Sequence, residues 1–273
     1  IARLEIELAS RRLQRTSRGV TPTSAGLAFY SQAQLALRHA DDAILAAREA
    51  RLSGHVSVGM APSTASVLGV PFINAMRESY PDVRLHLVES LSGNLERMIN
   101  TRQLDLAIVF QQEKILRWSA RPVLEERLFL IGTHALLAPL QEDHISPDQL
   151  TSLPLIMPSQ GHGLRGRLEA VCQQHHLSVE VVADIDGLAL LMQAVRSGLG
   201  ATLQPGAAIS HLDHQALRVI DVVNPILSRP NFLVSLSDDE LTPAGLAARV
   251  ILSKVMRQLV ESDRWPGATL YAH

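Results

Sequence analysis

The chain has 273 residues, of which 47% are hydrophobic and 19% charged, and this composition describes a globular protein that can bury a substantial core. Its formal net charge of −2 excludes a protein that coats nucleic acid with its whole surface, and no apolar run is long enough to span a membrane. Cys172 is the single cysteine, which excludes an intrachain disulfide framework. The lone thiol, together with the lack of a recognisable secretory leader, predicts a cytoplasmic protein.

Residues 1–18 form a local basic patch on this negatively charged chain. They contain two glutamates and five arginines, namely Arg3, Arg11, Arg12, Arg15 and Arg18. A patch of this kind is typical of a small nucleic-acid contact, although the same charges would also suit a solvated helix end.

The patch lies in a segment that reads as a helix, a hairpin and the start of a second helix. IARLEIELAS is amphipathic, and LQRT and GVT then flank Ser17-Arg18-Gly19, where glycine permits the positive φ of a tight turn. Thr23 is a good helix N-cap. This order predicts the C-terminal part of a winged helix-turn-helix over residues 1–23, and we expect the earlier helices of that domain to lie outside this sequence.

Residues 24–53 predict one long helix that stops at Gly54. Its apolar positions follow the 3-4-3-4-3 spacing of a coiled-coil seam and are Tyr30, Ala33, Leu37, Ala40, Ile44 and Ala47. A helix buried inside one globular domain is the alternative, which the strongly polar flanks disfavour. We therefore expect this helix to pair with that of a second chain.

From residue 54 onward, apolar strands alternate with helices. We expect strands at 55–60, 83–89, 104–110, 127–132, 153–158, 179–185, 201–205, 217–222 and 231–237, and helices at 65–80, 92–102, 163–176, 187–198 and 242–261. Continuous apolar strands separated by helices predict parallel strands covered on both faces. Two crossings, near residues 130 and 235, divide residues 54–265 into lobe one, about 54–130 and 237–265, and lobe two, about 131–236, with a cleft between them.

Three loops after predicted strands carry small polar side chains just before a helix. The residues are Ser63 and Thr64 in MAPSTAS, Ser92 in SLSGN, and Ser159, Gln160, His162 and Arg165 in MPSQGHGLRG. Unpaired N–H groups at helix starts, at the carboxyl edge of parallel strands, form ready anion sites. Plain N-capping is the alternative, but it needs only one such residue per helix. We expect the loops to face one cleft, with Arg165 as counter-charge.

Motifs for other chemistry are not apparent. His175-His176 ends a predicted helix and is interpreted as a solvated cap, because no cluster of further ligands has metal-site spacing. No nucleophile–base order, phosphate loop or carboxylate pair stands out. We therefore expect no metal, no cofactor and no enzymatic activity.

Taken in order, these parts resemble the LysR-type transcriptional regulators. The resemblance rests on IARLEIEL, RTSRGVTPTSAG, YPDV, LDLAIV and SGLGATLQP and covers essentially the whole chain. RGVTPTSAG, LSGHVSVGMAPSTAS and LFLIGT are similar to the nitrogen assimilation control subgroup. The implied fold is α/β: a two-lobe, periplasmic-binding-protein-like effector domain that follows a long linker helix and the remnant of a winged helix-turn-helix.

The resemblance also implies partners. Promoter DNA would be bound through Arg11, Arg12, Arg15 and Arg18, and the protein would be a homodimer or homotetramer, with RNA polymerase as a candidate partner. A small anionic effector would be held by Ser63, Thr64, Ser92, Ser159 and Gln160, with His162 and Arg165 as further candidates. Ala9 stands where the family usually has glycine, and Arg12-Leu13 where it has Leu-Phe, which puts the packing under the wing in doubt.

Three alternatives stay open. A LysR-type regulator can act without an effector, with the cleft filled by its own side chains. A solute-binding protein for uptake would explain residues 55–265 but leaves residues 1–53 without a role. An enzyme built on two α/β lobes would need a convergent set of titratable residues, which the sequence does not offer.

Overall fold

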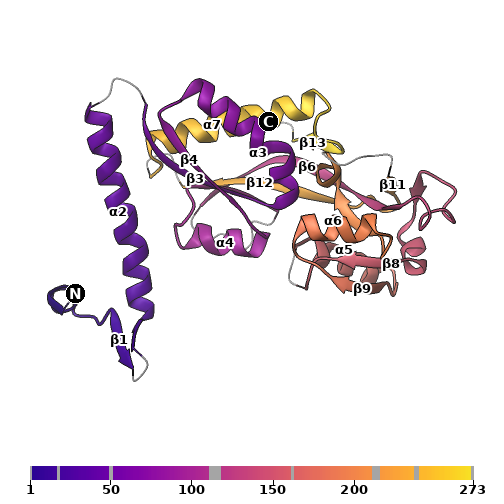
Figure 1. The fold of residues 1–273 in the computed structure, drawn as a ribbon, viewed down its shortest axis with the longest axis horizontal. Helices are drawn as coiled ribbons and strands as arrows, with labels where there is room; N and C mark the ends of the chain where they lie inside the picture. The colour runs from indigo at the N-terminus through magenta and orange to yellow at the C-terminus, as the bar shows by residue number, and fades with distance from the viewer. Residues whose placement is uncertain are drawn as a thin grey trace.

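A computed structural model describes residues 2–16, 19–48, 52–110, 118–160, 163–210, 216–236 and 240–271. Within these ranges, the side chains of residues 2, 3, 15, 16, 31, 35, 38, 39 and 41–48 are not described. Figure 1 shows a small N-terminal hairpin, a long helix that stands away from the rest of the chain, and two lobes side by side. No helix in the described part of the chain combines the length and the hydropathy needed to cross a membrane.

The N-terminal segment has the predicted order. Helix α1 (Ala2–Glu7) precedes strands β1 (Leu13–Thr16) and β2 (Gly19–Pro22), which pair antiparallel with Thr16 opposite Gly19. Gly19 has a φ of +124°, a conformation that side chains disfavour, so glycine is needed where the hairpin returns. The Thr23 hydroxyl accepts a 3.0 Å hydrogen bond from the Gly26 amide, which confirms the predicted cap.

Helix α2 spans Ser24–Arg48, about 37 Å at 1.5 Å per residue, and confirms a long linker helix. Of the predicted last turn, residues 49–51 lie outside the described residues, and Leu52 and Ser53 are not helical, so the helix ends earlier than predicted. In Figure 1, α2 carries the hairpin at one end and enters the first lobe through β3 at the other.

The first lobe is built on the parallel strands β4 (Val83–Glu89), β3 (Gly54–Met60) and β5 (Leu106–Val109), in that order. Helices α3 (Pro62–Ser79) and α7 (Pro243–Glu261) contact each other on one face, while α4 (Ser92–Asn100) covers the other. The larger core lies under α3 and α7, where Val56, Phe72 and Leu252 are fully buried. Buried apolar side chains on both faces explain the unbroken apolar strand at residues 106–109.

The second lobe contains β8 (Pro154–Met157) and β9 (Glu180–Asp184), which are parallel, with α5 (Gly163–Gln174) and α6 (Leu188–Arg196). Strands β10 (Thr202–Pro205) and β11 (Leu217–Val222) pair antiparallel with β6, and η2 (Gly206–Ile209) follows β10. The expected all-parallel arrangement is therefore wrong for these strands, and the complete sheet is mixed.

Two long strands join the lobes. Strand β6 (Ser119–Thr133) is much longer than the expected 127–132, because its first half pairs with β12 (Ser228–Ser235) and its second half with β10 and β11. Phe232–Ser235 pair with β5, so the end of β12 belongs to the sheet of lobe one rather than to lobe two, where the sequence interpretation placed it. The return crossing consequently lies nearer residue 228 than residue 235.

Four short elements were not predicted. They are η2, β7 (His144–Ile145), which pairs with β11, the 3-10 helix η1 (Pro147–Ser152), and β13 (Ala268–Leu270), which pairs with β6 at Leu124–Glu126. Strand β13 brings the C-terminal segment against the crossing strand, and so places Trp265 next to the junction of the lobes.

Candidate functional site

The three predicted loops meet at one narrow space between the lobes. Ser63 is the second residue of α3, Leu91 precedes α4, and Pro158 follows β8. All three residues line the same cavity of about 20 Å³. Ser63, Thr64 and Ser92 are buried, Ser159 is half-buried and Gln160 is exposed. His162 lies outside the described residues. A volume of this size accommodates about one water molecule.

A buried cation occupies the position expected for an anion. The Arg229 guanidinium, on β12, donates a 2.9 Å hydrogen bond to the Ser63 hydroxyl and a 2.8 Å bond from Nε to the Glu126 carboxylate. Its Cζ lies 3.7 Å from the centroid of the Phe110 ring. Arg229 therefore joins the crossing strands to the start of α3, and it fills the space that the sequence assigned to a ligand.

The charge of Arg229 is compensated inside the protein. Glu126 is fully buried and accepts bonds from Arg229, from the Asn231 amide at 2.9 Å and from the Trp265 indole N–H at 2.7 Å. Burial lowers the pKa of the Arg229 guanidinium, and the neighbouring Glu126 carboxylate opposes this shift. Because the pair is neutral as a unit, it offers an incoming anion little net attraction.

A second carboxylate makes the narrow cavity still less suited to an anion. Asp186 lines it and accepts a 2.9 Å hydrogen bond from the Ser159 backbone amide. The Thr64 and Ser92 hydroxyl oxygens are buried and have no hydrogen-bond partner among the described residues. Unpaired buried hydroxyls are costly, but neither Thr64 nor Ser92 lines the narrow cavity, so they do not add a donor to it.

Arg165, the expected counter-charge, lies elsewhere. Its Nε is 2.7 Å from Glu169 on the next turn of α5, and its Nη1 is 3.3 Å from Asp184 at the end of β9. The prediction of a cleft-facing Arg165 is corrected accordingly, since two carboxylates hold the guanidinium on lobe two. The cation that sequence reasoning missed is Arg229. It lies in the polar first half of β12, just before the expected strand 231–237, where no local pattern marks it.

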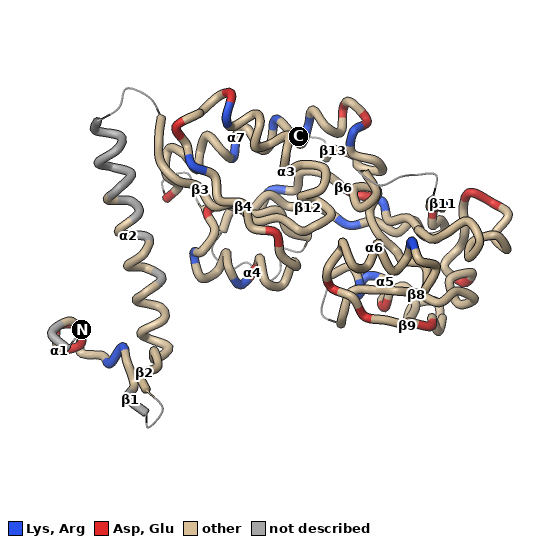
Figure 2. The backbone as a smooth tube through the Cα atoms, in the orientation of Figure 1, with Lys and Arg blue, Asp and Glu red and all other residues tan. Residues whose placement is uncertain are grey.

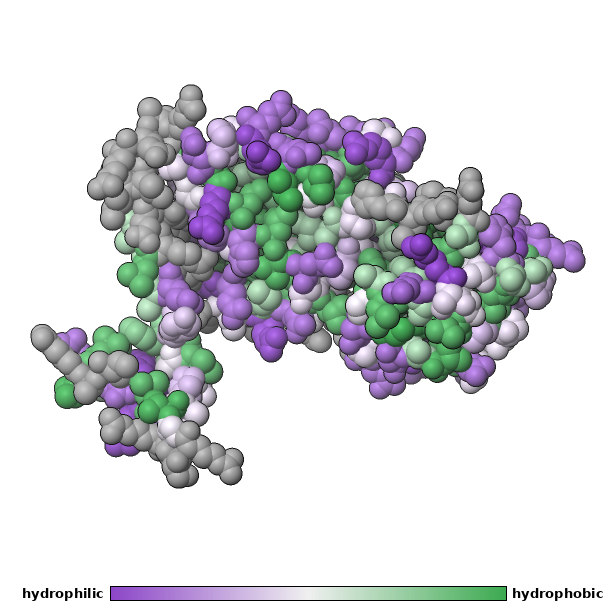
Figure 3. Space-filling model, viewed as in Figure 1, coloured by the Kyte–Doolittle hydropathy of each residue, from purple (hydrophilic) through white to green (hydrophobic). Residues whose placement is uncertain are grey.

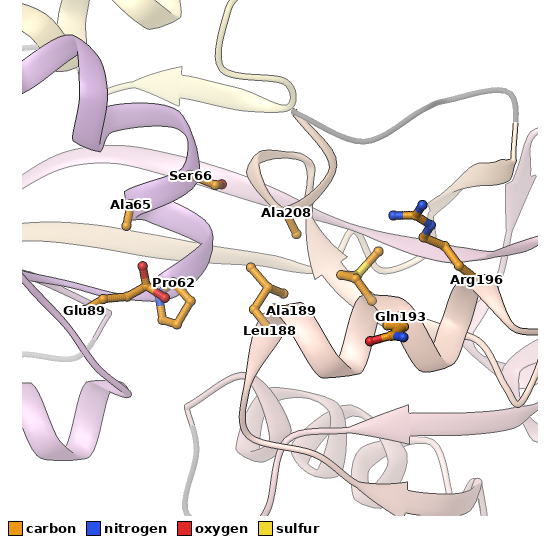
Figure 4. A pocket seen from close by; sticks show the side chains of 10 residues that line it. Pro62, Ala65, Ser66, Glu89, Leu188, Ala189, Gln193, Arg196 and Ala208 are labelled. Atoms are coloured by element: carbon orange, nitrogen blue, oxygen red, sulfur yellow. The ribbon is translucent and has the colours of Figure 1, made fainter.

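A larger cavity of about 610 Å³ opens between α3 and α6. Figure 4 shows Pro62, Ala65 and Glu89 on the lobe-one side, facing Leu188, Gln193 and Arg196 on the lobe-two side. Its volume lies in the range of small-molecule sites, and its walls are mostly apolar, with one carboxylate and one guanidinium at opposite ends. Pro62 and Leu188 also line the narrow cavity, so the two spaces adjoin.

Hydrogen bonds connect the basic hairpin to α1 before it and to α2 after it. Glu5 accepts hydrogen bonds from the backbone amides of Arg12 at 2.5 Å and Leu13 at 3.0 Å, and these bonds lower the pKa of its carboxyl group. The Arg12 side chain bonds the Ala25 carbonyl at 3.1 Å and lies over the Phe29 ring, 5.2 Å from its centroid.

The placement of Arg12 corrects its expected role. Its guanidinium holds the hairpin on α2, in the position where the family usually has an apolar residue, and is not directed outward toward a phosphate. Arg11 is exposed, and Figure 2 shows the basic stretch that enters β1. The Arg15 side chain and all of Arg18 lie outside the described residues.

The predicted seam of α2 is exposed in the single chain. Tyr30 is 60% exposed and Leu37 67%, Ala40 is exposed and Ala33 is half-buried. The side chains of Ile44 and Ala47 are not described. Figure 3 shows hydrophobic residues at the surface along α2 and around the hairpin. Exposed apolar side chains in a row along one helix are what a pairing surface would need.

The described residues contain no group of histidine, cysteine or acidic side chains that could hold a metal ion. Burial raises the pKa of the Cys172 thiol, and the nearby Glu169 carboxylate raises it further. Reactive cysteines have a lowered pKa instead, so Cys172 has the character of a small core residue packed under α5.

A two-lobe α/β domain that follows a basic hairpin and a long helix is typical of a class, the transcription regulators with an effector-binding domain. Residues 49–257 match the family model described as the LysR substrate binding domain. The chain belongs to the LysR family of transcriptional regulators and has the effector-binding domain of that family.

Similar proteins extend this assignment over the whole chain. The nitrogen assimilation regulatory protein nac of Escherichia coli (strain K12) is 31% identical over 277 residues, covering 97% of this chain and 87% of that protein. The corresponding protein of Klebsiella aerogenes is 31% identical over 267 residues, covering 96% of this chain and 86% of its own length. These relatives are regulatory proteins, not enzymes, and they confirm the subgroup suggested by the sequence.

Solved structures confirm the fold. A full-length OxyR variant from Pseudomonas aeruginosa has a TM-score of 0.74 at 20% identity, covering 100% of this chain and 87% of that chain. Full-length BenM has a TM-score of 0.65 at 18% identity, with coverage of 97% and 87%. At this identity the likeness concerns the fold alone.

Proposed function

We propose that this regulator works without a small anion at the Ser63 position, because its own Arg229 fills that position. In this function the amount of protein, rather than an anionic ligand at Ser63, sets promoter occupancy. The hairpin contacts DNA, α2 joins two chains, and the two lobes form the remaining assembly surface. The solute-binding alternative is set aside, since the chain belongs to a family of transcription regulators.

The Arg229–Ser63 hydrogen bond carries this proposal. An anion that took this position would have to displace a fully buried guanidinium from two oxygen partners and then sit beside Glu126 and Asp186. Two like charges within a few ångströms in a poorly solvated space repel strongly. The geometry therefore favours the effector-independent alternative over the anionic effector expected from the sequence.

DNA binding measured with added ligand tests the proposal. We expect millimolar acetate, succinate and 2-oxoglutarate, at matched ionic strength, to leave the affinity of the intact regulator for its promoter unchanged within about twofold. A ligand that does not bind one conformation of the protein more tightly than another does not shift their populations. A carboxylate that changed the affinity in the unaltered protein but not in Ser63→Val would contradict it. Measurements of fluorescence anisotropy at constant salt would suffice.

The larger cavity supports a second candidate function. Its volume of about 610 Å³ and its walls from both lobes suit a small effector that carries a carboxylate toward Arg196 and a donor group toward Glu89. A ligand that bridges both lobes can favour one arrangement of them. In that case the change in DNA affinity would be lost in Arg196→Gln and retained in Ser63→Val.

The DNA contact is proposed for the wing, with Arg11, Arg15 and Arg18 as its cations. Guanidinium groups at a hairpin suit phosphate oxygens, which position a protein without reading sequence. RNA polymerase is a candidate partner, and a cytoplasmic location follows from the proposed work on promoters.

Replacing Arg18 by alanine is expected to weaken binding to all duplexes about equally and to reduce the slope of log affinity against log salt by roughly one unit, because one phosphate contact is lost. Salt titrations on promoter and random duplexes measure both effects. Arg77→Ala, an exposed arginine on α3, is the control and should leave the slope unchanged. A variant that lost promoter preference at an unchanged slope would show that Arg18 reads bases.

A further inference from the structure

A third cavity, of about 250 Å³, lies wholly within lobe one, between α7 and the ends of β6 and β12. It is lined by Ser119 and Arg121 of β6, Leu233 and Ser235 of β12, and Arg249, Val250 and Ser253 of α7. Neither the family assignment nor the interlobe cleft gives this cavity a role.

The fold brings its polar residues together from three elements. Ser119 and Arg121 are two positions apart on β6 and therefore share a face, and they pair with Ser235 and Leu233 of β12. Arg249 and Ser253 are four positions apart on α7, so they lie on one side of that helix. The Arg249 guanidinium reaches the sheet, where it donates a 3.2 Å hydrogen bond to the buried Ser235 hydroxyl.

The charge and size of the cavity define its ligand. Its described lining contains two guanidinium groups and no carboxylate. Arginine offers planar, forked N–H donors that match the oxygens of phosphate and sulfate. A volume of about 250 Å³ is smaller than that of typical sites for drug-sized ligands, which begin at about 300 Å³, and suits a small oxyanion with a few waters.

We propose that lobe one binds a phosphate-type oxyanion in this cavity, between Arg121 and Arg249. The serine hydroxyls play the smaller part, because Ser235 donates to the Leu236 carbonyl at 2.9 Å and Ser253 donates to the Arg249 carbonyl at 2.9 Å. The two guanidinium groups therefore supply the recognition. Since all lining residues belong to lobe one, the anion stabilises that lobe and does not bridge the cleft.

Titration of the full chain with sodium phosphate, by calorimetry and by thermal unfolding, tests this site, with sodium chloride at matched ionic strength as the reference. We expect saturable binding and a rise in melting temperature with phosphate and sulfate that chloride does not produce. Arg121→Gln should weaken binding about tenfold or more, because a charge-assisted hydrogen bond contributes about 1.5–3 kcal/mol. Arg121 is exposed, so this variant should fold normally.

A matched control makes the result specific. Arg257→Gln changes another arginine of α7, whose Nη1 lies 3.9 Å from Glu261 outside the cavity, and this variant should bind phosphate like the unaltered chain. Equal binding by Arg121→Gln and the unaltered chain, or an equal effect of chloride, would overturn the proposal. Glycerol 3-phosphate identifies the source: tighter binding than inorganic phosphate indicates a phosphorylated metabolite, and equal or weaker binding indicates the free anion.

Discussion

Replacing Arg229 by methionine is expected to lower the free energy of unfolding by about 3–5 kcal/mol, because the change leaves the Glu126 carboxylate buried without its cation. Loss of the hydrogen bond to Ser63 and of the contact with the Phe110 ring adds to the cost. Urea unfolding at several protein concentrations gives the midpoint and slope from which this free energy is obtained.

A double-mutant cycle separates the ion pair from simple loss of packing. Glu126→Gln removes the carboxylate charge while an amide oxygen can still accept from Trp265, so the double variant Glu126→Gln/Arg229→Met should cost less than the two single changes added together. Arg127→Met is the matched control: its guanidinium is 38% exposed and lies 3.0 Å from Asp221, a surface pair that contributes about 0–1 kcal/mol. An Arg229→Met effect no larger than that of Arg127→Met would contradict a buried, mutually dependent pair.

The same network shows where sequence reasoning reached its limit. The hydroxyl side chains at Ser63, Thr64 and Ser92 could be placed, because each follows a strand and opens a helix, and both features are local patterns. The cation beside them could not be placed. Arg229 is 166 residues from Ser63 and 103 from Glu126, and only the crossing of β6 and β12 brings the three together. Arg165 was expected to be the counter-charge of the cleft because it is near one of the three loops in sequence. Its guanidinium instead contacts Glu169 and Asp184, both on lobe two.

The elements of the fold likewise differ in how well the sequence predicts them, and those set by local patterns are predicted best. The hairpin, the Thr23 cap and the parallel strands β3, β4 and β5 were predictable, since their turn residues and apolar runs are contiguous. Strand β6 was recognised only over its apolar second half. Its first half carries Arg121 and Pro122 and is held by antiparallel pairing with β12, more than a hundred residues later in the chain. Long-range pairing of this kind leaves little periodicity in the segment itself.

The linker helix is the other place where one substitution should have a large effect. Leu27, Tyr30 and Leu37 are each more than half exposed on the single chain, and Tyr30 and Leu37 lie on the predicted seam of α2. Burying a leucine side chain contributes about 1.5–3 kcal/mol, and a symmetric pair of helices buries each seam position twice. We therefore propose that α2 pairs with α2 of a second chain and that this contact holds the two DNA-binding ends together.

Leu37→Lys is expected to abolish this pairing, because two ammonium groups would face each other at the centre of the seam, where lysine is tolerated only at a cost in stability. Multi-angle light scattering at micromolar concentration should give the variant about half the mass of the unaltered protein, whose single chain has a mass of 29.8 kDa, because only the contact between lobes is left. The affinity of the intact regulator for a two-site promoter should fall about 100-fold or more, since the second contact is no longer tethered to the first. Gln32→Lys adds the same charge at an exposed position outside the seam, and should change neither the mass nor the affinity by more than about twofold. A mass that Leu37→Lys leaves unchanged would place the dimer contact on the lobes and leave α2 as a spacer only.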